Sequence, residues 1–181
     1  MEMSENLKER FSAVSNWKNI IQIVCISSFI VGLKSDGTVV CVEPPCIMHP
    51  EYDYNLDFST WEDIVMISVM DGGVYGLKND GTVIAVYKEG ANKNGKYNIP
   101  SNWTDIAYIF PNCGIVINSD GVMIDKKGNI IEVENAIYVG YSFGSPGFGD
   151  SFYCLRNDGS IWLEKNDVGN FLYGKTDIWV P

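Results

Sequence analysis

The chain has 181 residues, of which 46% are hydrophobic and 20% charged, a composition that excludes intrinsic disorder and predicts one folded domain. Its formal net charge of −10 disfavours direct binding of DNA or RNA, because most of its surface would repel phosphates. The longest apolar stretch, residues 20–31, is interrupted by polar residues and is shorter than the roughly 20 residues that span a bilayer. The acidic N-terminus does not resemble a secretory signal, so we expect a cytoplasmic protein without a membrane segment.

A repeated pattern begins after an N-terminal segment of residues 1–15. Four related units follow within residues 16–181, at about 16–59, 60–101, 102–132 and 133–181, and each carries an Asp-Gly pair between two β-prone runs. Such a spacing, roughly 40 residues, is typical of repeat architectures. The four pairs begin at Asp36, Asp80, Asp120 and Asp158.

Each unit is predicted to contain three strands. An Asp-Gly pair between β-prone runs favours a hairpin with a type I′ turn, which needs positive φ at both central residues. A further apolar run precedes each hairpin and begins at Trp17, Trp61 and Trp103, whereas the fourth copy, residues 134–139, lacks the tryptophan. We expect the tryptophans to pack in the core or between units.

Units of this size form small antiparallel sheets that cannot bury both faces alone, so they must stack. The sequence therefore predicts an all-β repeat protein whose four stacked units form either radial blades or a solenoid. Three arrangements remain open at this point: the four units close on themselves, stay an open arc, or complete a ring by dimerising.

The motif at residues 76–83, Gly-Leu-Lys-Asn-Asp-Gly-Thr-Val, followed by Pro-Ser-Asn-Trp-Thr-Asp-Ile at residues 100–106, resembles the bacterial form of the regulator of chromosome condensation repeat. Residues 61–100 match best, the first unit matches up to Val42, and the last two match at their hairpins. The resemblance implies that the units are four short antiparallel blades of a small or partial β-propeller, and it implies a role in protein–protein recognition. Family propellers usually have about seven blades, and the family's histidine after a glycine pair is replaced here by Val74.

The insertion between the first two units is the first candidate binding site. Eight acids and no Lys or Arg occur between Asp36 and Asp71, and aromatic residues stand among them. Aromatic side chains provide contact area at interfaces, and acids steer a basic partner. The alternative is a solvated loop whose aromatic side chains fold back on the sheet edge. The candidate residues are Glu43, Glu51, Tyr52, Asp53, Tyr54 and Asp57.

A second candidate is the Gly/Pro-containing loop at residues 141–150. Its aromatic residues Tyr141, Phe143 and Phe148 are placed where loops on a rigid scaffold often bind partners. The alternative is a plain connector.

No metal site, cofactor site or catalytic set is predicted. Cys41, Cys46, His49 and Glu51 lie close together in sequence, but structural zinc sites normally use paired C-x2-C-like spacings. His49 is the sole histidine, and no nucleophile has a recognisable base nearby. The five cysteines are irregularly spaced, which favours reduced thiols over a disulfide framework. We expect a protein that is not an enzyme.

These features favour a protein–protein interaction module. The acidic chain would cover a basic surface of a partner, for example an inhibitor of a nucleic-acid-handling enzyme, as in bacterial or phage counter-defence. One alternative is a structural assembly unit that completes a propeller ring by homodimerisation. Another is a carbohydrate-binding propeller, although the tryptophans fall at packing positions.

Overall fold

The computed structural model describes residues 12–26, 29–42, 56–70, 72–87, 92, 95, 98–110, 114–133, 135–142 and 151–164. The described chain is all-β apart from short turns and one helical turn at residues 12–15. Its strands form four small antiparallel sheets, as the sequence predicted. In these ranges no helix is long and apolar enough to cross a membrane.

The four sheets follow the four sequence units. Sheets A, B and D each contain three strands, and sheet C contains four because the short strand β10 is added at its edge. The prediction of three strands per unit is therefore confirmed for the first, second and fourth units and wrong for the third unit. The strands are β1 (Ile20–Ile26), β2 (Phe29–Lys34) and β3 (Val39–Val42) in sheet A; β4 (Ile64–Met70), β5 (Gly73–Lys78) and β6 (Val83–Tyr87) in sheet B; β7 (Ile106–Phe110), β8 (Ile115–Asn118), β9 (Met123–Asp125) and β10 (Ile130–Ile131) in sheet C; and β11 (Ala136–Ser142), β12 (Ser151–Arg156) and β13 (Ile161–Glu164) in sheet D.

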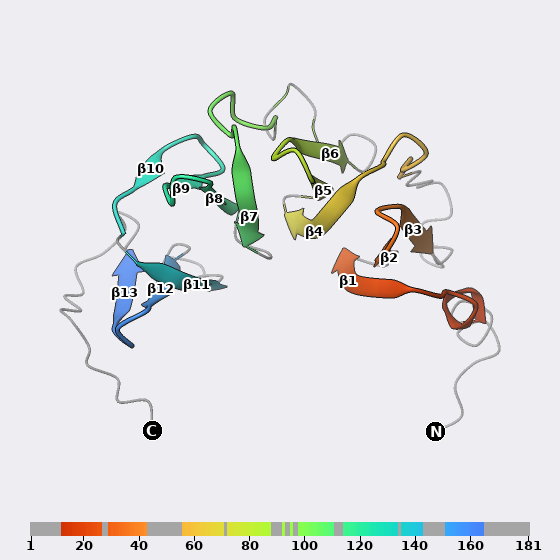
Figure 1. Cartoon of the computed structure of the whole chain (residues 1–181), viewed down its shortest axis with the longest axis horizontal. Helices are drawn as coiled ribbons and strands as arrows, with labels where there is room; N and C mark the ends of the chain where they lie inside the picture. Colours follow the sequence, from red (N-terminus) through yellow and green to blue (C-terminus); the bar gives the residue numbers. More distant parts are fainter. Residues whose placement is uncertain are drawn as a thin grey trace.

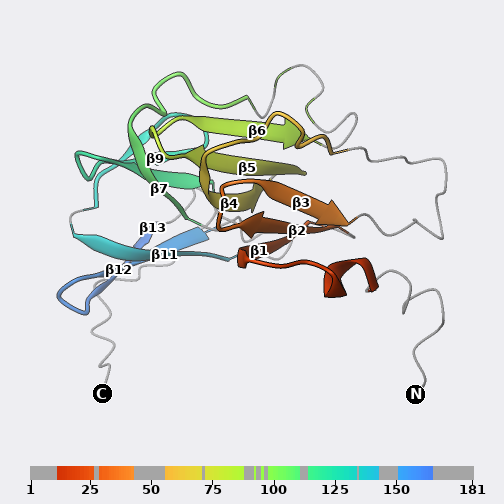
Figure 2. The ribbon, with the colours of Figure 1, turned by 45° about the vertical axis from the view of Figure 1, so that its right-hand side comes forward.

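The sheets lie one after another around an open arc, with sheets A and D at its two ends (Figures 1 and 2). The first strand of each sheet contacts the first strand of the next, in the series β1, β4, β7 and β11. These first strands lie on the inner side of the arc, and the last strands lie outside (Figure 1). Among the described residues, then, the four units do not close on themselves.

The Asp-Gly hairpins are present, but the predicted turn type is wrong. In the first hairpin only Gly37 has a positive φ, 81°, while Asp36 does not. The Gly37 N–H donates to the Lys34 carbonyl at 3.0 Å, and the Lys34 N–H donates to the Thr38 carbonyl at 2.9 Å. This is the three-residue hairpin in which a left-handed glycine ends an ordinary turn. The same bonds recur in the other three hairpins.

A left-handed Asn or Asp precedes the first strand of each sheet. These residues are Asn19, Asp63, Asp105 and Asn135, with φ between 52° and 60°. Their carbonyls accept the N–H that follows the second strand, for example Asn79 N to Asp63 O at 2.9 Å. Asn and Asp tolerate this conformation better than other side-chain-bearing residues. In sheets B and C this residue is the Asp two positions after Trp61 or Trp103, so the Trp-x-Asp motif is partly a backbone requirement.

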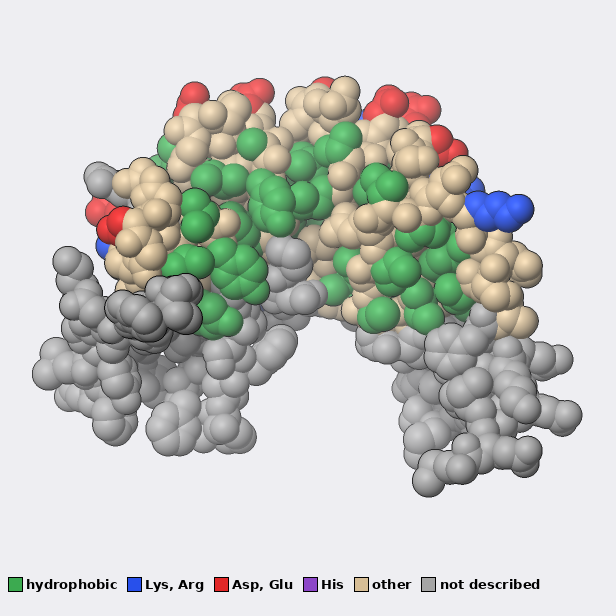
Figure 3. All heavy atoms as spheres, turned by 60° about the horizontal axis from the view of Figure 1, so that its bottom comes forward, with side chains coloured by type: hydrophobic (Ala, Val, Ile, Leu, Met, Phe, Trp, Pro, Cys, Tyr) green, Lys and Arg blue, Asp and Glu red, His purple; other side chains and the backbone are tan. Residues whose placement is uncertain are grey.

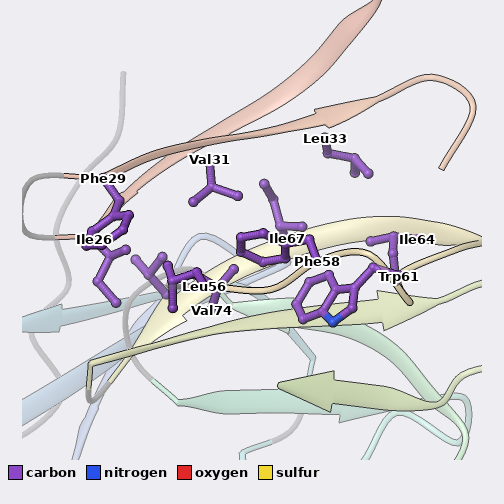
Figure 4. Close-up of a cluster of buried hydrophobic side chains, with 11 residues drawn as sticks. Ile26, Phe29, Val31, Leu33, Leu56, Phe58, Trp61, Ile64, Ile67 and Val74 are labelled. Carbon is purple, nitrogen blue, oxygen red and sulfur yellow. The ribbon is translucent and has the colours of Figure 1, made fainter. Parts of the chain in front are cut away.

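Each sheet has a front face toward the preceding unit and a rear face toward the next, and the core lies between them. Between sheets A and B, Val31 and Leu33 on the rear of A meet Ile64 and Ile67 on the front of B (Figure 4). Trp61 joins this cluster and is 6% exposed. Its ring lies over Gly76, where a Cβ would come within 2.6 Å of Trp61 Cζ3.

The same packing repeats along the chain. The B–C cluster combines Tyr75 and Leu77 with Trp103 and Ile109, and the C–D cluster combines Phe110 and Met123 with Val139 and Cys154. The burial of Trp61 and Trp103 is confirmed, whereas Trp17, in front of which the described strands form no sheet, is half-buried.

Direct backbone bonds join the first three sheets. The Gly37 carbonyl accepts the Ile64 N–H at 3.1 Å, and the Gly81 carbonyl accepts the Ile106 N–H at 3.0 Å. The backbones of sheets A and B are also in close contact here, because a Cβ added at Gly37 would lie 3.2 Å from Asp63 Cα. At Gly121, where sheet C meets sheet D, a Cβ would meet nothing within 4 Å of the described structure. The C–D junction is therefore more open at this edge.

This difference predicts unequal costs for two matched substitutions. Gly37→Ala and Gly121→Ala both place a methyl group at a φ of 81°, which we expect to cost about 1 kcal/mol. Gly37→Ala must also push Asp63 away and weaken the bond to Ile64, so we expect a total of about 2–3 kcal/mol. Urea denaturation of both variants measures the difference. Equal losses would show that the turn does not support the A–B junction.

Candidate partner-binding surfaces

Of the acidic loop predicted as a binding site, the structure describes Asp57. Its exposed carboxylate accepts the Ser59 N–H at 2.9 Å, and hydrogen bonds from Ser59 lower its pKa. On either side, Leu56 and Phe58 are each 9% exposed and belong to the A–B cluster. Phe58 packs edge-on against Trp61, with ring centroids 4.9 Å apart. The other candidates here lie outside the described residues: Glu43, Glu51, Tyr52, Asp53 and Tyr54.

The second predicted loop is described only where it leaves the sheet. Tyr141 belongs to β11, and its backbone is paired with Phe152 of β12. Phe143 and Phe148 lie outside the described residues.

An acidic surface that sequence reasoning missed lies at one end of the sheets. We call it the turn face: the Asp-Gly turns together with the residues just before each first strand. The bonds Asn79 N to Asp63 O and Ile64 N to Gly37 O hold these segments side by side. Lys18 is its exposed basic side chain, while Lys34, Lys78 and Arg156 are half-buried. The exposed carboxylates are Asp36, Glu62, Asp63, Asp80, Asp105, Asp120 and Asp158.

Local hydrogen bonds favour the ionised form of two turn-face carboxylates, those of Asp36 and Asp80. The Thr38 hydroxyl donates to Asp36 Oδ1 at 2.6 Å and the Thr38 N–H at 3.0 Å, and these bonds hold the pKa of Asp36 below its ordinary value of 3.8. The Thr82 N–H, at 2.9 Å, chiefly lowers the pKa of Asp80 in the same way. In the third turn Asn118 Oδ1 instead accepts the N–H groups of Asp120 and Val122.

A row of exposed apolar residues borders the turn face. Every first strand has a bulge at its second residue, where its register with the second strand shifts. We call these residues the inner row: Ile21, Val65, Ala107 and Ile137. Ile21, Val65 and Ile137 are 60%, 47% and 61% exposed. Figure 3 looks onto the inner side of the arc and shows hydrophobic side chains gathered below an acidic rim.

A cleft of about 1010 Å³ lies where sheets C and D meet. Ile117, Met123 and Val133 supply apolar walls, and Asp120, Glu132 and Arg156 supply charge. Arg156 Nε is buried and has no hydrogen-bond partner in the described structure. The cleft interrupts the otherwise continuous turn face between Asp120 and Asp158.

Within the described ranges, no three His, Cys, Asp or Glu side chains gather closely enough to hold a metal ion. Cys25, Cys41 and Cys154 form no disulfide among the described residues. Cys46 and His49, considered above as zinc ligands, lie outside these ranges.

Comparison with known protein families and with curated proteins finds no match. Among solved structures, the chain is similar to the computationally designed Ika4 protein. The match has a TM-score of 0.43 and 17% sequence identity, and it covers 81% of this chain and 90% of that one.

The turn face leads to a prediction about proton binding. Thr38→Ala removes the hydroxyl donor, so the pKa of Asp36 should rise toward 3.8. Because the folded-state pKa is lowered, this bond adds stability above that ordinary value and loses it as the pH falls through the lowered pKa. An NMR titration of the Asp36 carboxyl carbon measures the shift.

Thr38→Ser keeps the hydroxyl and is the control, for which we expect almost no change. An unchanged pKa in Thr38→Ala would mean that the hydroxyl does not hold the carboxylate.

Proposed function

We propose that this chain is a protein-binding module that docks its turn face on a basic surface of a partner protein. The observation that supports this most is the shared register of acid and apolar residues. In sheet B, exposed Asp63 precedes exposed Val65 by two positions, and in sheet C Asp105 precedes Ala107 likewise. In these two sheets an exposed carboxylate and an exposed apolar side chain therefore lie two positions apart at the same end of the first strand.

This combination suits a protein partner. Apolar area in the inner row provides contact energy, and the carboxylates beside it select for and attract a basic surface. The hydrogen bonds that lower the pKa values of Asp36 and Asp80 favour the charged form of both carboxylates. A nucleic acid would be repelled by the same charges. An enzyme with a basic substrate groove, including one that handles nucleic acid, fits this chemistry.

We further propose that the four sheets are blades of a partial β-propeller of the chromosome-condensation-regulator kind. Units joined front to rear, with first strands on the inside, support this, as do the Trp-x-Asp and Asp-Gly motifs at equivalent places in sheets B and C. In such an arc the scaffold fixes the spacing of the docking residues.

A matched pair of variants tests the docking proposal. One neutralises four turn-face carboxylates by Glu62→Gln, Asp63→Asn, Asp105→Asn and Asp120→Asn. Asn keeps the left-handed preference at positions 63 and 105. The other removes the same charge from the acidic loop by Glu43→Gln, Glu51→Gln, Asp53→Asn and Asp57→Asn.

We expect the turn-face variant to associate with the captured partner about tenfold more slowly, or slower still, and with a weaker salt dependence. Exposed charges at an interface act mainly on the association rate. The partner is first captured from a cell lysate at low salt, identified and purified, and rates are then measured by surface plasmon resonance. The reverse pattern would place docking at the acidic loop. Unchanged rates in both variants would refute electrostatic docking.

A further inference from the structure

The front face of sheet A carries the apolar residues that form a sheet–sheet junction elsewhere in the arc, but here they are exposed. By register, Ile23 and Cys25 of β1 correspond to Ile67 and Val69 of β4. Ile67 and Val69 are 0% and 8% exposed because they pack on the rear of sheet A. Ile23, in contrast, is 54% exposed, and Cys25 is also exposed. The same apolar face that is buried in sheet B is thus open in sheet A.

The rear face of sheet D is the opposite half of the same kind of interface. Tyr153 and Leu155 of β12 correspond to Tyr75 and Leu77 of β5, which are 3% and 2% exposed against sheet C. Tyr153 is 37% exposed, and its neighbour Tyr138 on β11 is 54% exposed. One end of the arc therefore offers a front face and the other end a rear face.

The backbone groups that join successive sheets also recur at the two ends. Ile64 N–H binds the Gly37 carbonyl, and the equivalent groups at the ends are those of Ile20 and Gly159. Gly159 has the same left-handed φ, 78°, and is exposed, and a Cβ there would meet nothing within 4 Å of the described structure. Gly37, by contrast, is buried against Asp63.

Charge favours joining these two ends. At the position after the tryptophan, sheet B has Glu62 and sheet C has Thr104, but sheet A has exposed Lys18. At a D-to-A junction, Lys18 would stand beside the turn that carries Asp158, as Glu62 stands beside the turn that carries Asp36. The junction at the ends would pair opposite charges where the internal A–B junction brings like charges together.

We propose that a second copy of this chain covers both ends, so that two arcs related by a two-fold axis close one ring of eight sheets. The rear of sheet D packs on the front of sheet A of the other copy, and this junction occurs twice. Sheets A and D, at the two ends of the arc, lie apart (Figure 1), so the front of sheet A and the rear of sheet D do not pack on each other within one chain. The proposal does not depend on the function proposed above, since no partner protein takes part.

The first test is the mass of the purified protein by light scattering and sedimentation over a wide dilution series. We expect twice the chain mass. Ile23→Glu puts a charge into both junctions and should raise the dimer dissociation constant about a hundredfold or more. The control is Ile130→Glu on β10, equally apolar, 65% exposed and away from both end faces, which should stay dimeric.

A second test uses the thiol that the front face already carries. Val31 and Val69, equivalent to Tyr153 and Cys25, pack in one cluster across the A–B junction. Tyr153→Cys should therefore form a disulfide with Cys25 of the other copy under mild oxidation, giving a dimer on a non-reducing gel. Adding Cys25→Ser should abolish this band.

A monomeric wild-type protein throughout the dilution series would overturn the proposal. So would masses that grow beyond two chains, because they would mean open polymers. A dimer that Ile23→Glu leaves intact and that Tyr153→Cys fails to cross-link would place the contact elsewhere and refute the end-to-end ring.

Discussion

The structure depends on the packing of one sheet's rear face on the next sheet's front face. A sheet of three short strands cannot cover either of its own apolar faces, and an isolated unit would leave residues such as Ile67 and Leu77 in water. Stacking buries both, to 0% and 2% exposure. A backbone bond from Ile64 to Gly37 and from Ile106 to Gly81 then sets the register of the contact. Glycine is favoured in these two turns by its positive φ, and also because the next unit's backbone lies directly against it.

The proposed binding surface is a consequence of the same constraint. Asp63 and Asp105 are the left-handed residues just before the first strands of sheets B and C, and they lie on the turn face. The bulge two residues later leaves Val65 and Ala107 exposed on the inner side. Repetition of the packing therefore repeats the surface, at a spacing that the core fixes. Where sheet C gains β10 and meets sheet D, the pattern opens into a cleft.

The amino-acid pattern was sufficient for the number of units, the hairpins and the burial of Trp61 and Trp103, because period-2 runs and Asp-Gly pairs are local signals. It was misleading for the turn type, since Asp-Gly fits both a type I′ turn and a turn that ends in a left-handed glycine; the acceptor role of Asp36 toward Thr38 was the missed clue. The two-residue strand β10 is too short to show a period. The turn face was missed because its carboxylates are dispersed in sequence and are brought together only by contacts between units.

Amide hydrogen exchange at Ile64 and Ile106 tests the central claim most directly, because these two N–H groups bind the turn of the preceding sheet. If packing of sheet on sheet holds the fold together, both amides should exchange only when the whole arc unfolds, with a free energy equal to that from urea denaturation. Exchange at Ile64 or Ile106 as fast as at exposed Glu62 and Thr104, whose N–H groups make no hydrogen bond within the described structure, would contradict the account, because the units would then separate without unfolding.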